Sequence, residues 1–259
     1  MSIKSKVLAA AATLTLVGGV GAAGVLSAAP AMAGTPSCGG GCVNFFSQDF
    51  GPGFTLDVLR QGEKVGQPII LFRTANFDPA LDWDITFQGT VADFFEAGLV
   101  NAETALHYGC LTAIFPGGSC SDATVPGPFP NLDAFEVEYA PYGVNSGLCL
   151  GVAATAFQNE GATLQPCGVS AKTVWIADTL DSPLTFFKGF FPAINGSNTN
   201  FSHPYVLTYP SSGYPTDKPR PQLILQNLTG FTQPAQPELP EISTVSSSQL
   251  WSAFFGVSP

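Results

Sequence analysis

Apolar and polar residues alternate in short runs along this chain, and turns rich in glycine and proline separate the runs. Three passages repeat one order: an apolar run, a turn, a second run, a second turn, and a third run with a tryptophan. The runs are 54–58, 67–72 and 82–87, then 149–152, 162–167 and 173–177, then 205–209, 221–225 and 249–255. Short alternating runs between turns are typical of β-strands, so the pattern predicts an all-β fold of three similar units.

The spacing inside the units is similar in two of them. Each unit contains one of the three tryptophans of the chain, Trp83, Trp175 and Trp251. A leucine of the first run, Leu56 or Leu150, precedes the tryptophan by 27 residues in the first unit and by 25 in the second. In the third unit Val206 precedes the tryptophan by 45 residues, and the excess falls in the proline-rich stretch 234–240. The spacing indicates related units, the third of them extended.

A long insertion, 88–132, separates the first unit from the second. Its start, Thr90 with Asp93 three residues later, matches a helix N-cap followed by a capping acid. An apolar stripe with helical spacing follows at Val91, Phe94, Phe95, Leu99 and Leu106. We therefore expect a helix here, and after it a loop rich in Gly, Pro and Ser.

A second departure, 181–204, carries an aromatic cluster and a turn rich in Asn, Ser and Thr. The clustered rings are Phe186, Phe187, Phe190 and Phe191. We expect them in the core or in a strand pair and not as a ligand platform. Three asparagines match glycosylation acceptor patterns or serve as turn residues: Asn195, Asn200 and Asn227.

The composition agrees with strands and turns, since the chain has 28 glycines, 22 prolines and 21 phenylalanines. The formal net charge is −10, and it becomes −12 when a cleaved leader removes Lys4 and Lys6. Such a surface repels phosphate backbones and anionic membranes. We therefore expect no nucleic-acid partner, and no membrane contact once the leader is removed.

Residues 1–33 have the features of a signal peptide. Lys4 and Lys6 form a short positive region, an uncharged apolar stretch follows over 7–26, and 31–33 has the small residues that signal peptidase requires. Glycines interrupt the apolar stretch, which argues against a membrane anchor. The stretch is rich in Ala and Gly, and in this composition it resembles the leaders of high-GC actinobacteria. The prediction is a secreted, extracellular protein with a Cys- and Gly-rich segment at 34–42 and one domain over 43–259.

All six cysteines follow the leader: Cys38, Cys42, Cys110, Cys120, Cys149 and Cys167. An even number in an exported chain indicates three disulfides, and six cysteines allow fifteen pairings. Pairing of sequence neighbours is the most economical of these. A zinc site would need a second cysteine pair or a nearby histidine beside 38–42, and the chain has neither, so we expect no metal.

The three units resemble the repeat of ricin-type β-trefoil lectins, which opens with Cys-Leu-Asp-Val, continues with Gln-Leu-x-x-Cys and closes with Gln-x-Trp. The matching residues are Leu56-Asp57-Val58 and Trp83, then Cys149-Leu150-Gly151-Val152, Leu164-Gln165-Pro166-Cys167 and Trp175, then Gln249-Leu250-Trp251. The resemblance implies a β-trefoil of three degenerate repeats, with a helical and loop insertion between repeats 1 and 2. It also implies a structural Cys149–Cys167 bridge and core positions for the three tryptophans.

The same resemblance implies where a sugar would bind. In the family the aspartate of Leu-Asp-Val holds hydroxyls, a ring of the middle strand stacks on the sugar, and a polar pair before the tryptophan completes the site. Repeat 1 has Asp57, Phe72 and a possible polar helper in Asn76, but Ala80 and Leu81 replace the polar pair. A sugar site is therefore expected in repeat 1, with low affinity.

Repeats 2 and 3 each lack part of the set. In repeat 2, Gly151 stands for the aspartate and Gln165 for the ring. In repeat 3, Thr208 stands for the aspartate, while polar residues fit the remaining positions: Gln222, Ser248 and Gln249. We therefore expect no complete sugar site in either.

Catalytic signatures are not recognised in the chain, and no cofactor is expected. His107 at the end of the helix and His203 before a proline are interpreted as surface residues. Asp82 and Asp84 flank Trp83. Glu136 and Glu138 have a spacing that could serve glycosidase chemistry. We expect instead the solvated face of an amphipathic strand whose apolar residues point inward: Phe135, Val137 and Tyr139.

The leading hypothesis is a secreted, non-catalytic module that binds a glycan or cell-wall polysaccharide. The second is an extracellular structural or protein-interaction domain without a sugar site, which an exposed apolar patch lacking polar groups would favour. The third is a hydrolase of unrecognised type, which a cleft with paired, perturbed carboxylates would favour.

Overall fold

A computed structural model describes residues 42–74, 81–109, 132–177, 189–210, 221–230 and 244–255, all within one compact unit, Ala33–Pro259. The predicted signal peptide, Cys38, Cys110, Cys120 and Asn76 lie outside the described residues. Cys42 is disulfide-bonded, and its partner is not among the described residues. No helix of the described part is long and apolar enough to cross a membrane.

Twelve strands in the described residues form three sets of four, which we call repeats 1 to 3. Repeat 1 has β1 (Val43–Ser47), β2 (Phe54–Val58), β3 (Ile69–Arg73) and β4 (Trp83–Thr90). Repeat 2 has β5 (Asp133–Tyr139), β6 (Leu148–Val152), β7 (Ala162–Pro166) and β8 (Trp175–Ala177). Repeat 3 has β9 (Phe191–Asn195), β10 (Tyr205–Thr208), β11 (Ile224–Asn227) and β12 (Leu250–Phe255). Short 3₁₀ turns occur at η2 (Gly51–Gly53), η3 (Leu59–Gln61), η6 (Pro141–Gly143) and η8 (Ser247–Gln249).

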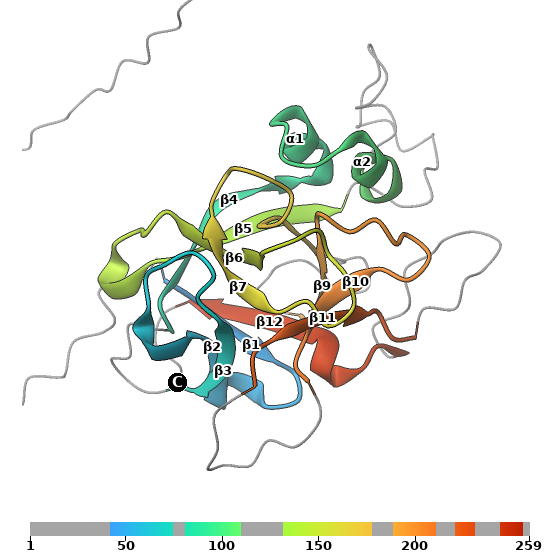
Figure 1. Ribbon diagram of the computed structural model, residues 1–259. Helices are drawn as coiled ribbons and strands as arrows, with labels where there is room; N and C mark the ends of the chain where they lie inside the picture. Colours follow the sequence, from blue (N-terminus) through green and yellow to red (C-terminus); the bar gives the residue numbers. More distant parts are fainter. Residues whose placement is uncertain are drawn as a thin grey trace, which may run out of the picture. The chain divides into compact units, whose positions relative to one another are not determined.

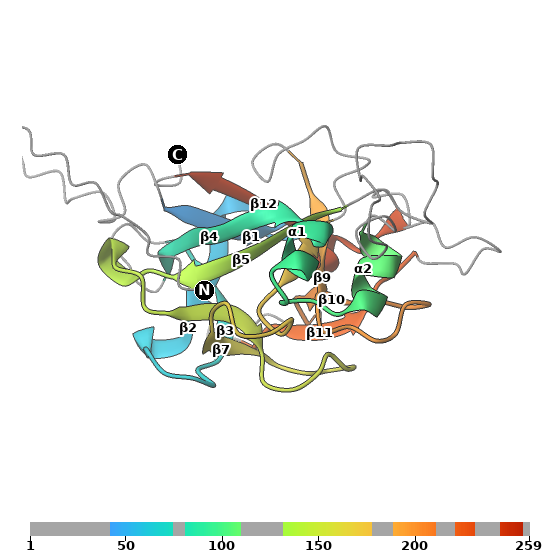
Figure 2. The ribbon, with the colours of Figure 1, turned by 90° about the horizontal axis from the view of Figure 1, so that it is seen from above.

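The first and last strands of the repeats close a six-stranded barrel. Antiparallel pairs run β1–β4, β4–β5, β5–β8, β8–β9, β9–β12 and β12–β1, so the ring has no open edge. Figure 1 labels the strands, and Figure 2 shows β12, β1, β4 and β5 side by side in this ring. Closure matters because an open edge exposes unpaired backbone groups to other chains.

The middle strands of the repeats form three hairpins, β2–β3, β6–β7 and β10–β11. Single β-bridges join each hairpin to the other two, at Pro68–Thr163, Ile70–Gln222 and Gly161–Ile224. A closed six-stranded barrel joined to three hairpins is a β-trefoil. The predicted all-β trefoil of three repeats is therefore confirmed.

The three tryptophans occupy equivalent places. Each is at most 1% exposed, and each indole N–H donates to the carbonyl of a leucine in the first hairpin strand of its own repeat. The N···O distances are 3.2 Å for Trp83–Leu56, 2.9 Å for Trp175–Leu150 and 2.8 Å for Trp251–Leu207. A buried indole needs such a partner, and the partner fixes the orientation of the ring. The predicted core role is confirmed, but the counterpart of Leu56 in repeat 3 is Leu207, not Val206.

Aromatic and aliphatic side chains from all three repeats fill the barrel. Phe135 of β5 stacks on Phe45 of β1 and meets Phe191 of β9 edge-on, each pair with ring centroids 5.9 Å apart. These three rings and the leucines Leu56, Leu150 and Leu207 line a small apolar space between the strands. Phe191 is therefore a core residue, as the sequence predicted for its cluster, and Phe190 packs edge-on against Phe46.

The described part of the insertion folds into two short helices, α1 (Val91–Glu96) and α2 (Ala102–Tyr108). The predicted capping box is confirmed, because the Thr90 hydroxyl accepts from the Asp93 N–H and the Asp93 carboxylate accepts from the Thr90 N–H. The expected single helix is not continuous. Gly98 has a φ of +75°, and Asn101 caps a new helix by accepting from the Thr104 N–H. Leu106 is exposed, so it does not extend the apolar stripe.

The two helices cover part of the outside of the barrel (Figure 2). Val91, Phe94 and Ala105 belong to a second apolar cluster with residues of the barrel strands, such as Ile176 and Ile194. α2 also contacts the β9–β10 connection, where the Thr104 hydroxyl donates to the Gly196 carbonyl. The insertion thus adds a second, external core to the trefoil.

The Cys149–Cys167 disulfide, with its Cα atoms 5.1 Å apart, links β6 to the residue after β7. Repeat 1 has Thr55 and Thr74 at the equivalent positions, given the pairing of Leu56 with Leu71 and of Leu150 with Leu164. The local backbone agrees, since the N–H of Thr74 donates to Gly53 and that of Cys167 to Gly147. The Thr55 hydroxyl is buried without a hydrogen-bond partner, so little is lost by replacing it.

Cysteines at positions 55 and 74 are therefore expected to form an additional disulfide and to raise the free energy of unfolding by up to about 3 kcal/mol. Intact mass under non-reducing conditions would detect the new disulfide. Urea unfolding would measure the change in the free energy of unfolding. Thr55→Val is the matched control, because it removes the hydroxyl without adding a cross-link. Two free thiols in Thr55→Cys/Thr74→Cys would contradict the equivalence of the two hairpins.

Candidate functional site

Hairpin β2–β3 brings two of the predicted site residues to one face. Leu56 and Val58 point into the barrel core, so Asp57, which alternates with them, points to the opposite face. Thr55 pairs with Phe72, and Asp57 pairs with Ile70. Asp57 and Phe72 are therefore diagonal neighbours on that face, a separation of about 7–8 Å between Cα atoms, within reach of one small ligand.

The two side chains differ in exposure. Phe72 is half-buried, while Asp57 is only 4% exposed. Leu81, at the position of the polar pair, is a buried core residue. Asn76 and Ala80 lie outside the described residues. Of the predicted site residues, the described part of repeat 1 therefore contains the acid Asp57 and the ring of Phe72. It has no polar group at position 81.

Repeat 2 has no room for an aspartate where repeat 1 has Asp57. A Cβ on Gly151 would lie 2.8 Å from the Lys172 carbonyl oxygen and 2.9 Å from the Thr173 methyl group. The 170–173 turn thus fills the space in which an acid would meet a sugar. Gln165, at the ring position, donates to Thr163 on its own strand.

Repeat 3 uses its polar residues internally. Thr208 and Gln249 are each 1% exposed, and the Gln249 amide donates to the Thr208 hydroxyl at 3.2 Å and to the Asn227 carbonyl at 2.9 Å. The Oε1 of Gln249 accepts from the N–H and the hydroxyl of Thr229, both at 2.8 Å. Gln222 likewise donates to the Ala162 carbonyl. Gln249 thus joins hairpin β10–β11 to the segment before β12, and Gln222 joins it to hairpin β6–β7.

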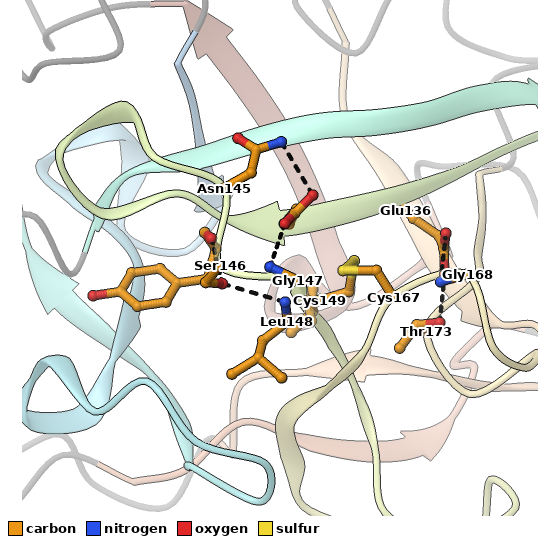
Figure 3. Close-up of a disulfide and its surroundings, with 12 residues drawn as sticks. Glu136, Asn145, Ser146, Gly147, Leu148, Cys149, Cys167, Gly168 and Thr173 are labelled. Carbon is orange, nitrogen blue, oxygen red and sulfur yellow. Dashed lines mark hydrogen bonds between the residues drawn. A yellow bond between two sulfur atoms is a disulfide. The ribbon is translucent and has the colours of Figure 1, made fainter. Parts of the chain in front are cut away.

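Glu136 and Glu138 are buried, 2% and 7% exposed, so the expectation of a solvated strand face is wrong. Glu136 accepts from the Gly168 N–H at 3.0 Å and from the Thr173 hydroxyl (Figure 3). Glu138 accepts from the Gly147 N–H and, at 3.1 Å, from the Asn145 amide. The loops before β6 and after β7 fold over this strand face and bind its carboxylates. Both glutamates therefore anchor the loops on either side of the Cys149–Cys167 bridge.

The two histidines lie on α2 and between β9 and β10. His107 is half-buried on α2, and its ring stacks on Phe201 with centroids 4.0 Å apart. Burial lowers the pKa of His107, and the Glu103 carboxylate opposes that shift. His203 is exposed, as expected. Next to His107, burial raises the pKa of Tyr108, whose hydroxyl accepts from Asn198.

Among the described residues, no group of three or more His, Cys, Asp and Glu side chains could hold a metal ion. Asn195 is fully buried and donates to the Lys172 carbonyl, so it is a structural turn residue and not a glycosylation site in the folded protein. Asn227 is exposed.

One exposed feature near repeat 2 was missed at the level of sequence. The loop between β5 and β6 displays Tyr142 and Val144, which are 65% and 68% exposed. The signal that could have indicated it is the Pro141-Tyr142-Gly143 triplet, since proline and glycine favour a tight turn that carries the residue between them outward.

No protein-family model and no curated protein sequence matches this chain. Solved structures similar to it include the designed three-fold symmetric protein ThreeFoil, at 10% identity over 84% of this chain and 99% of that one, with a TM-score of 0.45. A mosquitocidal holotoxin is 11% identical over 82% of this chain, with a TM-score of 0.44, and the match spans 17% of the toxin chain. The agglutinin of Abrus precatorius is 13% identical over 88% of this chain and all of its own, with a TM-score of 0.24. The β-trefoil fold itself is established by the strand pairing of this chain.

Proposed function

We propose that this chain is a secreted, non-catalytic β-trefoil module that binds carbohydrate through repeat 1. The observation that carries the proposal is the placement of Asp57 and Phe72 on one face of hairpin β2–β3. A hexose needs a ring against its apolar face and fixed polar groups for its hydroxyls, and this pair supplies one of each. At the equivalent places repeat 2 has a glycine and a glutamine, and repeat 3 has a threonine in place of the acid.

The affinity of this site for a single sugar is expected to be low. Leu81 is apolar and buried where the family has a polar residue, so some hydroxyls of the sugar would lose hydrogen bonds to water without replacement. A dissociation constant in the millimolar range corresponds to about −4 kcal/mol. Repeated units of a cell-wall polysaccharide would raise the apparent affinity if several copies of the module act together.

Phe72→Ala is expected to weaken sugar binding at least tenfold, because the stacking face is lost while the half-buried position tolerates a smaller residue. The chain without 1–33 would first be screened on a glycan array and on insoluble polysaccharides. Amide chemical shifts would then be titrated with the sugars that bind. Gln165→Ala is the matched control, since Gln165 occupies the same register position in repeat 2.

Asp57→Asn tests the role of the carboxylate in the same titration. Because Asp57 is buried, thermal melting is recorded as well, to separate a loss of binding from a loss of stability. Equal binding by wild type, Phe72→Ala and Asp57→Asn would remove this site. Absence of binding to every glycan would instead favour an extracellular structural or protein-interaction domain. Release of new reducing ends from any polysaccharide would contradict the non-catalytic part of the proposal.

A further inference from the structure

The β5–β6 loop, 140–147, holds an exposed aromatic residue in an unfavourable backbone conformation. Tyr142 has φ 56° and ψ 24°, the left-handed region that bulky side chains rarely adopt. Its ring gains little from packing, since the residue is 65% exposed. Glycine would satisfy this backbone at lower cost, so neither local conformation nor the core explains a tyrosine here.

Hydrogen bonds at both ends keep the loop in place. The Asp82 carboxylate accepts from the Tyr142 N–H at 3.2 Å, and the Asp82 carbonyl accepts from the Ala140 N–H at 2.9 Å. At the other end the Ser146 hydroxyl donates to the Tyr139 carbonyl at 2.6 Å. The exposed ring is thus presented on a preorganised loop, which reduces the entropy that a ligand must overcome on binding.

Polar groups with a fixed orientation lie on the same loop and on the adjoining strand. The Asn145 amide nitrogen donates to Asp84 at 3.3 Å and to Glu138 at 3.1 Å. Because a carboxylate oxygen only accepts hydrogen bonds, these two bonds identify the amide nitrogen of Asn145 and therefore the position of its Oδ1. Asn145 is exposed and makes no hydrogen bond through its Oδ1 to another described residue, and Asp84 is partly exposed. The loop that carries Tyr142 and the strand β4 beside β5 therefore each provide one acceptor.

We propose that the 140–147 loop is a second carbohydrate-contact surface, in which Tyr142 stacks on the C–H face of a hexopyranose and Asn145 and Asp84 accept from its hydroxyls. The inference rests on the proposed carbohydrate binding but uses neither Asp57 nor Phe72. A ring with fixed oxygen acceptors suits a neutral, hydroxyl-rich ligand, because sugar hydroxyls donate to such acceptors while C–H groups pack on the ring.

Tyr142→Gly separates binding from folding. Glycine relieves the positive φ, so this variant is expected to melt no earlier than wild type and yet to bind sugar at least tenfold more weakly. Tyr142→Phe keeps the ring and is expected to bind within about twofold of wild type. The probes are the methyl glycosides of galactose, glucose and N-acetylglucosamine, titrated into the oxidised protein by amide chemical shifts. Phe157→Ala is the control for loss of an exposed ring elsewhere.

The pattern of variants distinguishes the two sites. Loss of binding in Tyr142→Gly, with shifts at 140–147, supports this second surface, and loss in Phe72→Ala supports the site in repeat 1. Binding that survives Tyr142→Gly but not Phe72→Ala overturns the inference and leaves the proposed function standing. The reverse result overturns the repeat 1 site alone. No shift with any of the three glycosides overturns the inference.

Discussion

Trp175→Ala is expected to lower the free energy of unfolding by about 3–5 kcal/mol, as for other large rings removed from a core. Trp175 is fully buried in the barrel, and its indole donates to the Leu150 carbonyl at 2.9 Å. The substitution therefore leaves a cavity and also a buried carbonyl without its donor. Urea unfolding of the oxidised protein, followed by far-UV circular dichroism, would measure the change.

The equivalence of the repeats sharpens this test. Trp83→Ala and Trp251→Ala are expected to cost similar amounts, because each indole makes the same bond to its own hairpin. Phe157→Ala, at a side chain that is 47% exposed, serves as the control and is expected to change stability by about 0.5 kcal/mol or less. A loss below about 1 kcal/mol at any of the three tryptophans would contradict its place in the core.

Removal of the Cys149–Cys167 disulfide is expected to cost about 3 kcal/mol in the chain-entropy model. The bridge closes a loop with a sequence separation of 18 residues. Without the bridge, the unfolded chain has more conformational freedom, which favours the unfolded state. The double variant Cys149→Ser/Cys167→Ser should melt clearly earlier than wild type. It should still bind a ligand of the repeat 1 site, because the bridge joins β6 to the residue after β7 and includes neither Asp57 nor Phe72.

The double alanine variant is the matched control for the double serine variant. Cys149 is fully buried, so a serine adds the cost of a buried hydroxyl to the loss of the cross-link, whereas alanine does not. Both variants are expected to be less stable than wild type, the serine variant more so. Unchanged melting of the alanine variant would mean that the loops bound by Glu136 and Glu138 already confine this segment.

Local patterns were enough to predict the last three strands of each repeat, the three tryptophan units and the helix start at Thr90. They did not predict β1 and β9, the first strands of repeats 1 and 3. Strand alternation, tryptophan spacing and a capping box are short-range features whose physical cause lies within a few residues. The same information placed Asp57 and Phe72 on neighbouring strands. It failed at Gly98, where one positive φ divides the expected helix in two, and at Val206, because the long third repeat obscures which residue is the counterpart of Leu56.

Only the tertiary structure decided what covers each face of a strand. Alternation indicated that Glu136 and Glu138 point away from the core, but two loops fold over that face and bury both carboxylates. Likewise, the residue at position 151 had to be small because a turn more than twenty residues later occupies its space. Such contacts join segments far apart in sequence, and hydrophobic periodicity carries no information about them. They determine which repeats retain room for a ligand.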